Sequence, residues 1–463
     1  MEQYHVVAMR LLLLALYAAA TLFLAVHHEP WRDEADSWLV VNNASLGEIF
    51  RWTRYAATPP LWYVLLKPLA WLGLPYFSQT ALHLALAWSA AAVVVFFAPF
   101  TRLTKVLYLA SYYPIYQYSV IARSYVLTSL LLFIAAALYP ARRERPILYA
   151  IAIVLLLNTN IHGAVIAATL MLLFAIERPR KYAAIAIMAA ALIVLLFELR
   201  PPRDASHPNI IRYIDPEALP LTIGYAFLPS LPMYLAFVIG LVVLAFIGWS
   251  LRKRHDALIL LLAPLALFGF MHTFIWFGGY HHAGILLTLV IGALWIGRPA
   301  DKATAILLNL TLLASAIAAI PIERSEITMA FSGAKEMGEF IRDHHLDRYE
   351  LAGHKPYECE AVMPYLPGKQ IWYTGLGRYG TYLPWDRSLR EAGNMTYREA
   401  AASASRFFGA QQKPWLLLFN AKMSFPERRG FRLVYATRRT VFWVTDEEFW
   451  LYEPLRPDWH SAP

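Results

Sequence analysis

The sequence predicts a polytopic α-helical membrane protein of about eleven transmembrane helices, followed by a C-terminal soluble α/β domain. Of its 463 residues 59% are hydrophobic and only 16% are charged, and the mean hydropathy is +0.44. One soluble core would not use so many apolar residues. The apolar residues gather in long runs up to Ile320, and beyond it charged residues return. We therefore expect a membrane domain over 1–320 and an extracytoplasmic domain over 321–463.

The first apolar run, Val6–Val26, is long enough to cross about 30 Å of hydrocarbon. It lacks a convincing cleavage site, so we interpret it as an uncleaved anchor. Ten runs follow: Phe77–Phe97, Val106–Ser119, Tyr125–Tyr139, Ile147–Asn158, Ile161–Ile176, Ala183–Leu199, Leu231–Trp249, Ala257–Phe277, Ala283–Ile296 and Thr304–Ile320. Several fall short of the usual length of about 20 residues. We expect Val106–Ser119 and the pair around Asn158 to be broken or re-entrant, which would change the count by one or two.

Basic residues between the runs predict the orientation of the chain. Those that strict alternation places on one side are Arg102, Lys105, Arg142, Arg143, Arg145, Arg178, Arg180, Lys181, Arg252, Lys253, Arg254, Arg298 and Lys302, and Arg10 near the start of the first run lies on the same side. Loops rich in Lys and Arg stay on the cytoplasmic side. The first loop, 28–76, and everything after Ile320 are then predicted outside an inner (cytoplasmic) membrane. These loops contain many of the basic residues behind the net charge of +9. We therefore attribute the charge to orientation in the membrane and expect membrane lipids, and no nucleic acid, as partners.

The first outer loop begins with the segment HEPWRDEADSW at His28–Trp38, which holds Asp33, Glu34 and Asp36 beside Arg32. A membrane protein places such groups where water or a substrate can meet them, although an ordinary solvated loop would contain them too. Further along, Ser45-Leu46-Gly47-Glu48 has the spacing of a helix capping box. We expect a surface helix there and a second one over Leu61–Leu72.

Alternation of the spans across the membrane also places a set of polar residues at the outward ends of spans or in outward loops. They are Asp33, Glu34, Arg123, Tyr125, Asn158, Asn160, His162, Arg203, Tyr280, His281 and His282. Each has an ordinary interpretation as a helix-end or interfacial residue. Because all of them lie on the side of the acidic loop, we predict that they converge on one site.

Four segments resemble a known family: the Asp33-Glu34 pair, TPPLWYVLL at Thr58–Leu66, ARSYVL at Ala122–Leu127 and NTNIHG at Asn158–Gly163. In this order they resemble the bacterial GT-C glycosyltransferases that use polyprenyl-phosphate sugars, relatives of protein O-mannosyltransferases and of lipid A aminoarabinose transferases. The resemblance covers about Met1–Ile320. It implies a polyprenyl-phosphate-linked sugar donor, a glycan, lipid or protein acceptor, and Asp33 at the catalytic centre with Glu34 as its neighbour. Many relatives carry an acid just before the Arg of the third segment, whereas this chain has Val120-Ile121-Ala122.

The chemistry assigns roles to these residues. An acceptor hydroxyl that attacks an anomeric carbon must lose its proton, and a carboxylate within hydrogen-bond reach serves as the base, which we predict to be Asp33. A polyprenyl phosphate that leaves needs cationic or hydrogen-bonding partners. The candidates are Arg123, His281 and His282, with Arg203 and Arg212 as alternates, and we expect Tyr125, Asn160, His162 and Tyr280 to line the substrate site.

The stereochemistry and the metal dependence stay open. We favour inversion, mainly because of the resemblance; a retaining route would need a second carboxylate as nucleophile, which Glu34 or Asp36 could offer. Two acids and two histidines could bind a divalent ion such as Mg²⁺ or Mn²⁺, but no ligand spacing demands one. The competing function is a multispan transporter or lipid-handling scaffold, for which internal repeats with broken spans would be typical. We find no such repeat.

The residues after Ile320 predict helices that alternate with short strands. We expect helices over Ala334–His344 and Tyr397–Phe408, buried strands at Trp372-Tyr373 and Trp415–Phe419, and a strand pair formed by Phe431–Ala436 and Thr440–Thr445. Helices that alternate with short strands favour a small α/β layer. Its aromatic residues could stack on sugars, but such residues more often form a core.

Overall fold

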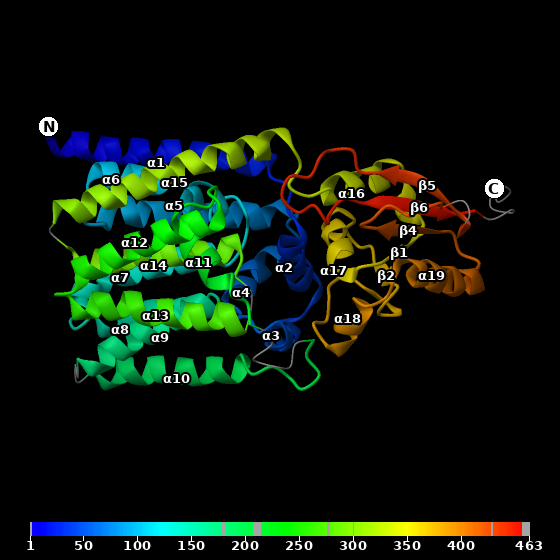
Figure 1. Ribbon diagram of the computed structural model, residues 1–463. Helices are drawn as coiled ribbons and strands as arrows, with labels where there is room; N and C mark the ends of the chain where they lie inside the picture. Colours follow the sequence, from blue (N-terminus) through cyan, green and yellow to red (C-terminus); the bar gives the residue numbers. More distant parts are fainter. Residues whose placement is uncertain are drawn as a thin grey trace.

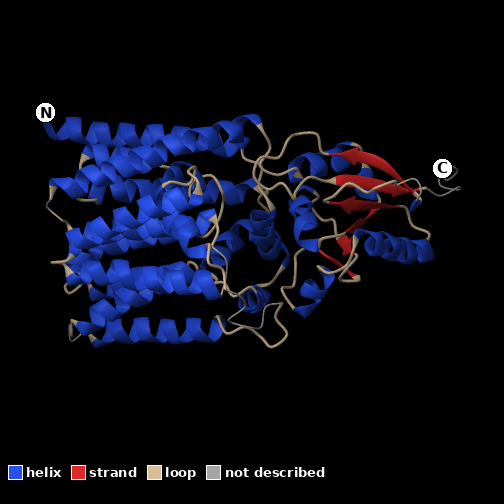
Figure 2. Ribbon diagram, viewed as in Figure 1, coloured by secondary structure: helices blue, strands red, loops and turns tan. Residues whose placement is uncertain are grey.

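The computed structural model describes residues 2–177, 181–206, 214–275, 278–299, 301–426 and 429–455. It has two parts: a bundle of roughly parallel helices, and a smaller domain at one end of that bundle (Figure 1). The strands of the described residues all lie in the smaller domain (Figure 2). The predicted fold class, a multi-pass helical bundle followed by an α/β domain, is confirmed.

Six helices of the described chain are long and apolar enough to cross a membrane. They are α1 (Glu2–His27), α5 (Phe77–Phe97), α12 (Met233–Leu251), α13 (His255–Phe274), α14 (Tyr280–Gly297) and α15 (Lys302–Thr328). Shorter helices complete the bundle: α6 (Arg102–Ala110), α7 (Tyr125–Leu138), α8 (Pro146–Leu157), α9 (Ile161–Ile176), α10 (Tyr182–Glu198) and α11 (Ala218–Phe227). Because the backbone must satisfy its own hydrogen bonds in lipid, apolar runs of this length become helices. Each of the eleven predicted runs coincides with helix.

One predicted run is interrupted, and one helix of the bundle has no counterpart among the predicted spans. The run Val106–Ser119 is broken, as expected: α6 ends at Ala110 and a π-helical turn, η1 (Tyr113–Gln117), follows it. Helix α11 was missed, because its ten residues are too short for a span. Helix α15 continues past Ile320 to Thr328, so the division of the chain at 320 stays a prediction.

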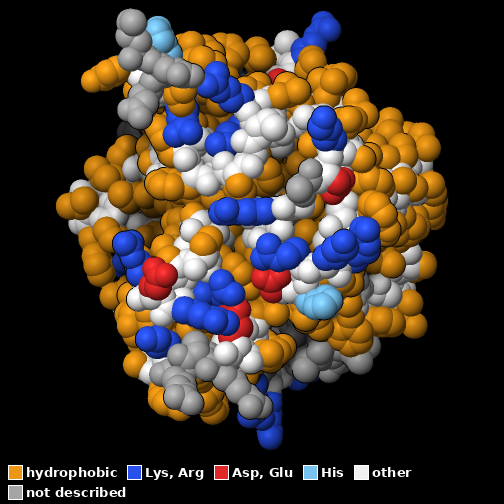
Figure 3. All heavy atoms as spheres, turned by 90° about the vertical axis from the view of Figure 1, so that its left-hand side faces the viewer, with side chains coloured by type: hydrophobic (Ala, Val, Ile, Leu, Met, Phe, Trp, Pro, Cys, Tyr) orange, Lys and Arg blue, Asp and Glu red, His pale blue; other side chains and the backbone are white. Residues whose placement is uncertain are grey.

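The loops with the basic residues lie at the end of the bundle away from the α/β domain (Figure 1). That face carries many Lys and Arg side chains and fewer Asp and Glu (Figure 3). Arg178 and Arg180, which belong to the predicted set, lie outside the described residues. The basic loops that strict alternation places on one side therefore lie together at one end of the bundle.

The first loop is more helical than we expected. His28–Trp38 is not a loop, because α2 (Arg32–Asn43) begins within it, after an extended Trp31. Asp33 and Glu34 occupy the first turn, where the helix dipole stabilises negative charge. The capping box is confirmed, since the side chain of Ser45 accepts from the amide of Glu48 at the start of α3 (Leu46–Tyr55). The second predicted surface helix is α4 (Leu61–Trp71).

A mixed six-stranded sheet of order β3-β2-β1-β4-β6-β5 forms the α/β domain. Its strands are β1 (Glu350–Gly353), β2 (Ile371–Tyr373), β3 (Arg378–Gly380), β4 (Trp415–Phe419), β5 (Phe431–Ala436) and β6 (Trp450–Pro454). Its helices are α16 (Ala334–Asp343), α17 (Pro356–Cys359), α18 (Arg387–Ala392) and α19 (Tyr397–Gln411), with short 3₁₀ turns at η3 (Leu346–Arg348) and η4 (Glu360–Tyr365); a further one, η2 (Tyr139–Ala141), lies in the bundle. Strand β1 runs parallel to β2 and β4, and the other pairings are antiparallel.

One predicted strand pairing is wrong. Strand β5 pairs with β6 and not with Thr440–Thr445. The segment 440–445 instead bonds to the end of the bundle, where Ala330 donates to the carbonyl of Thr440 at 3.0 Å and Phe442 donates back to Ala330 at 3.0 Å. Trp443 meets the ring of Tyr280 at the start of α14, with 5.3 Å between the ring centroids. This segment therefore joins the two parts of the protein.

Candidate active site

Asp33 lies where the bundle meets the α/β domain, and each of its carboxylate oxygens has a partner. The Arg123 guanidinium bonds to Oδ2, and the hydroxyl of Tyr357, from α17, donates to Oδ1 at 2.7 Å. The Asp33 side chain is 13% exposed and that of Arg123 is 23% exposed. The structure thus brings the predicted base and the predicted phosphate ligand into direct contact, and it adds a tyrosine that the sequence analysis missed.

Glu34 points away from Asp33 into a buried network. Its carboxylate accepts from the backbone amide of Ala122 at 2.7 Å and bonds to Nε2 of His28 at 2.9 Å. Nδ1 of His28 bonds to Glu326 of α15 at 3.0 Å, and Tyr116 donates to the other oxygen of Glu326. Burial alone would lower the pKa of His28, but the two carboxylates outweigh it and raise this pKa to about 10. Glu34 therefore ties α2 to the bundle through a charged histidine.

Two further buried acids lie between α2 and the α/β domain. Oδ1 of Asp36 and both carboxylate oxygens of Glu360 have no hydrogen-bond partner among the described residues. Burial raises the pKa of both groups well above the ordinary range of carboxylic acids, and in Glu360 the charge of Asp36 adds to the effect. A carboxyl that is buried without a cation is held in its neutral form. Sequence reasoning offered Asp36 only as an alternate nucleophile and missed Glu360.

Aromatic and histidine rings extend from Arg123 into the bundle. The Arg123 guanidinium lies 5.5 Å from the ring centroid of Tyr125, and that ring lies 5.3 Å from His281 and 5.7 Å from His282. His162 stacks on His282 at 5.0 Å. These rings belong to α7, α14 and α9, so part of the predicted convergence is present.

His272 of α13 completes the histidine group and was missed. Its Nε2 lies 2.8 Å from Nε2 of His162, and its Nδ1 bonds to the hydroxyl of Thr222 at 2.6 Å. His272 also sits in the last turn of an apolar helix. It would have been found by the criterion that selected the other histidines, an outward span end.

Two other predicted residues, Asn160 and Tyr280, have structural contacts, and a third, Arg203, lies on the surface. Asn160 caps α9 by accepting from the amide of Gly163 at 2.9 Å, and Tyr280 stacks on Tyr225 at 4.5 Å. Arg203 is exposed. Its loop bonds to the α/β domain and not to Asp33, because the next residue, Asp204, accepts from the amide of Arg387. Its proposed alternate, Arg212, lies outside the described residues.

The described part of the chain contains no group of three or more His, Cys, Asp or Glu side chains placed to hold a metal ion. The single cysteine, Cys359, is buried, and its Sγ lies 2.9 Å from the carbonyl oxygen of His354. Neither observation identifies a cofactor site.

A groove of about 590 Å³ opens between the end of the bundle and the α/β domain. On the bundle side it is lined by apolar residues such as Val26 and Phe77, which are 55% and 53% exposed. On the other side the described lining contains Lys335, Arg342 and Lys369 and no Asp or Glu. Helix α2 forms one wall through Trp38 and Leu39, so the groove and Asp33 share this helix.

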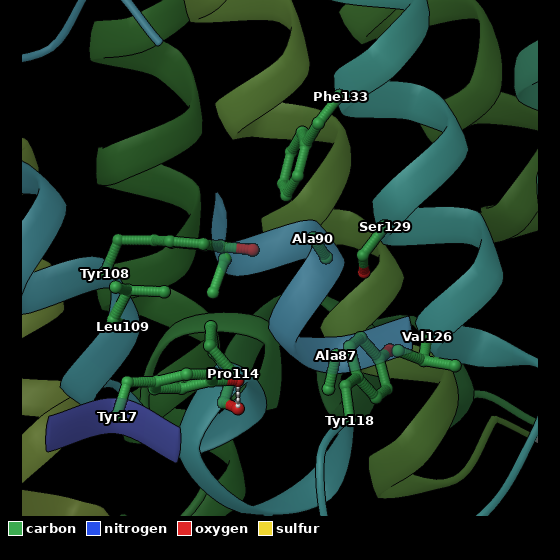
Figure 4. A pocket seen from close by; sticks show the side chains of 11 residues that line it. Tyr17, Ala87, Ala90, Tyr108, Leu109, Pro114, Tyr118, Val126, Ser129 and Phe133 are labelled. Atoms are coloured by element: carbon green, nitrogen blue, oxygen red, sulfur yellow. Dashed lines mark hydrogen bonds between the residues drawn. The ribbon is translucent and has the colours of Figure 1, made fainter. Parts of the chain in front are cut away.

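A second cavity, of about 20 Å³, lies inside the bundle (Figure 4). Tyr17, Tyr108 and Tyr118 are among its lining, and the Tyr17 hydroxyl donates to the carbonyl of Pro114 at 2.6 Å. Such a volume holds about one water molecule, which is too small for a sugar or a lipid.

Fold and site together define a multi-pass membrane protein with a carboxylate–arginine pair beneath an α/β domain. No protein-family model and no curated protein matches the sequence. Among solved structures, the chain is similar to the crystal structure of ArnT from Cupriavidus metallidurans bound to undecaprenyl phosphate, with a TM-score of 0.54 and 11% identity. The match covers 95% of this chain and 97% of that one. At this identity the similarity establishes a shared fold.

Proposed function

We propose that this protein is a membrane glycosyltransferase that moves a sugar from a polyprenyl-phosphate donor to an acceptor hydroxyl on a glycan, lipid or protein. The observation that carries the proposal is the contact of Asp33 with Arg123 at the junction of bundle and α/β domain. A base for the acceptor and a cation for the leaving phosphate are the two groups that this reaction needs at close range. The fold supports the proposal, because the ArnT structure that shares it holds undecaprenyl phosphate.

In this mechanism Asp33 takes the proton of the acceptor hydroxyl while the hydroxyl oxygen attacks the anomeric carbon. The bond to the phosphate oxygen breaks at the same time, and the electron pair leaves with the polyprenyl phosphate. Arg123 is positioned for the developing negative charge, with His281 and His282 beyond Tyr125 as further partners. Asp33 thus acts on the acceptor and Arg123 on the donor.

The geometry favours inversion over retention. A retaining enzyme needs a second carboxylate that attacks the sugar from close range. Glu34 does not offer one, because its oxygens bond to His28 and to the amide of Ala122. A neutral Asp36 is a poor nucleophile, since burial raises its pKa. A single displacement with Asp33 as base therefore fits the neighbourhood best.

The groove supplies a route for a lipid-linked donor. Its exposed apolar wall belongs to the ends of α1 and α5, which suits a polyprenyl chain, and the cations Lys335, Arg342 and Lys369 on the opposite wall suit a phosphate. Cationic side chains near a membrane surface attract anionic lipids by about 1 kcal/mol each. We assign to the groove the capture of the donor, before its phosphate reaches Arg123.

The orientation of the protein forms part of the proposal. The basic loops lie at the end of the bundle opposite the site, and such loops stay in the cytoplasm. The site and residues 321–463 would then lie on the outer face of a bacterial inner membrane, which is where a polyprenyl-phosphate sugar meets its periplasmic acceptors. A reporter fused after Leu455 should be active only outside, and one inserted at Lys253 only inside.

The test of the function uses the purified chain in detergent or lipid nanodiscs. It is incubated with a panel of polyprenyl-phosphate sugars, and mass spectrometry detects the released polyprenyl phosphate. We expect turnover of at least one donor, and its loss in Asp33→Asn. If no member of the panel is turned over by the folded protein while lipid-dependent transport is detected, the transporter or lipid-handling alternative takes its place.

A further inference from the structure

Resting on the proposed function, we infer that the Tyr357 hydroxyl occupies the position of the acceptor hydroxyl, so that the α/β domain plugs the site until an acceptor displaces it. A general base must lie about 2.6–3.2 Å from the oxygen whose proton it takes. The Tyr357 hydroxyl donates to Oδ1 of Asp33 at 2.7 Å. Arg123 bonds to the other oxygen, and the Asp33 side chain is only 13% exposed, so we assign to the acceptor the position from which Tyr357 now donates.

The backbone conformation after β1 places Tyr357 next to Asp33. After β1, Lys355 takes a left-handed conformation with φ of 58°, and Pro356 starts the single turn of α17. Proline fits a first helical position, because its ring holds φ near the helical value and no amide is lost there. The turn directs the next side chain, Tyr357, away from the sheet and onto α2.

Two neighbours hold the tyrosine ring in place. The Arg32 guanidinium lies 4.9 Å from the ring centroid, and the ring of Trp385 meets it edge-on at 5.5 Å. Arg32 itself is bonded to the α/β domain: its guanidinium contacts Asp446 at 2.7 Å, and its amide donates to Glu447 at 3.1 Å. The α/β domain therefore bonds to the first turn of α2 at Arg32, the residue next to Asp33.

Tyr357 is suited to block the base and not to react. Burial raises the pKa of its hydroxyl, so the group stays a neutral donor at physiological pH and is neither a base nor a phenolate nucleophile. While it donates to Oδ1, its hydroxyl fills the position from which a water molecule would otherwise donate to Asp33. Without an acceptor, water that reaches Asp33 would hydrolyse the donor, so a plug protects the lipid-linked sugar.

The first experiment compares Tyr357→Phe with the parent, using a polyprenyl-phosphate sugar that the parent turns over, water as one acceptor and glycerol as the probe alcohol. Loss of the competing hydrogen bond should raise both donor hydrolysis and transfer to glycerol by about fivefold. The matched control is Tyr373→Phe, because the buried Tyr373 hydroxyl has no partner among the described residues; its rates should equal those of the parent. Unchanged or lower rates in folded Tyr357→Phe would overturn the plug and make Tyr357 a positioning residue.

The second experiment needs no activity. A water-soluble carbodiimide couples glycine ethyl ester to accessible carboxylates, and peptide mass spectrometry measures the extent at Asp33. We expect faster labelling of Asp33 in Tyr357→Phe than in the parent and in Tyr373→Phe; equal labelling in all three contradicts the plug. If labelling rises while the parent turns over no donor, the proposed function and the acceptor position fail, and only the covering of Asp33 by Tyr357 is supported.

Discussion

Oε1 of Glu34 accepts a hydrogen bond from the backbone amide of Ala122 at 2.7 Å. This bond joins the first turn of α2 to the segment that immediately precedes Arg123. Asp33 and Arg123 are the neighbours of these two residues in the chain, so the bond holds them opposite each other. Glu34 therefore holds the two segments together, whereas Asp33 is the residue that we propose to act as the base.

We expect Glu34→Gln to destabilise the protein by about 3 kcal/mol, because it leaves the buried His28 cation with one carboxylate in place of two. Thermal unfolding followed by tryptophan fluorescence measures the loss as a lower Tm. The matched control is Glu48→Gln in the exposed capping box of α3, which should move Tm far less. Equal shifts in the two variants would contradict the buried network.

Asp33→Asn should lower turnover by about 10²- to 10⁴-fold, because an amide cannot accept the proton of the acceptor. The amide oxygen still accepts from Arg123 or Tyr357, so donor binding and Tm should change little. Initial rates at saturating donor, with Tm measured alongside, provide the test. Full activity in a folded Asp33→Asn protein would remove the catalytic assignment.

Arg123→Lys keeps the positive charge but not the planar fork that can bind phosphate through two donors. We expect the KM for the donor to rise by about tenfold, because the variant loses roughly one charge-assisted hydrogen bond to the phosphate. Arg203→Lys serves for comparison, because the structure places Arg203 on the surface and in a different loop. A larger effect in Arg203→Lys than in Arg123→Lys would transfer the phosphate role to Arg203.

The buried groups predict that stability falls as pH rises from mildly acidic to alkaline. The pKa of Asp36 is raised by burial, so the native state keeps a proton that the unfolded chain releases above about pH 4. His28 adds to this trend: its pKa rises from 6.5 to about 10 on folding, so its contribution is complete below 6.5 and is lost by about 10. Tm measured from pH 5 to 9 should decline. In Asp36→Asn the decline should be smaller, and a steeper one would contradict the neutral carboxyl.

The groove predicts a lipid-specific effect. Replacing Lys335, Arg342 and Lys369 together by Gln should raise the KM for a long-chain donor by about tenfold or more, since each cation contributes about 1 kcal/mol to attraction of an anionic lipid. kcat should stay unchanged, and a short-chain, water-soluble donor should be affected less. Arg406→Gln on the exposed side of α19 is the control. An equal loss with both donors would exclude a role in lipid capture.

The apolar runs predicted the helices of the bundle apart from the short α11, since lipid leaves the backbone of such a run no other way to satisfy its hydrogen bonds. They also placed Asp33, Arg123 and the span-end histidines at one end, because alternation needs only helix lengths and loop charges. Local patterns likewise identified α3, α16, α19 and β4, whose signals lie within a few residues of each other.

Pairings between distant residues came from packing alone. Glu34 and Ala122 are 88 positions apart, and Asp33 and Tyr357 are 324 apart. No periodicity within one segment therefore distinguishes Glu34, which bonds to His28 and Ala122, from Asp33, which meets Arg123 and Tyr357. The same reason explains the wrong strand pair: 440–445 and β6 are both short and rich in aromatics, and the sheet edge that β4 leaves open accepts β6. Where local propensity does not distinguish two segments, packing between elements decides which of them pairs. In this chain, packing decided which of the two neighbouring acids contacts Arg123.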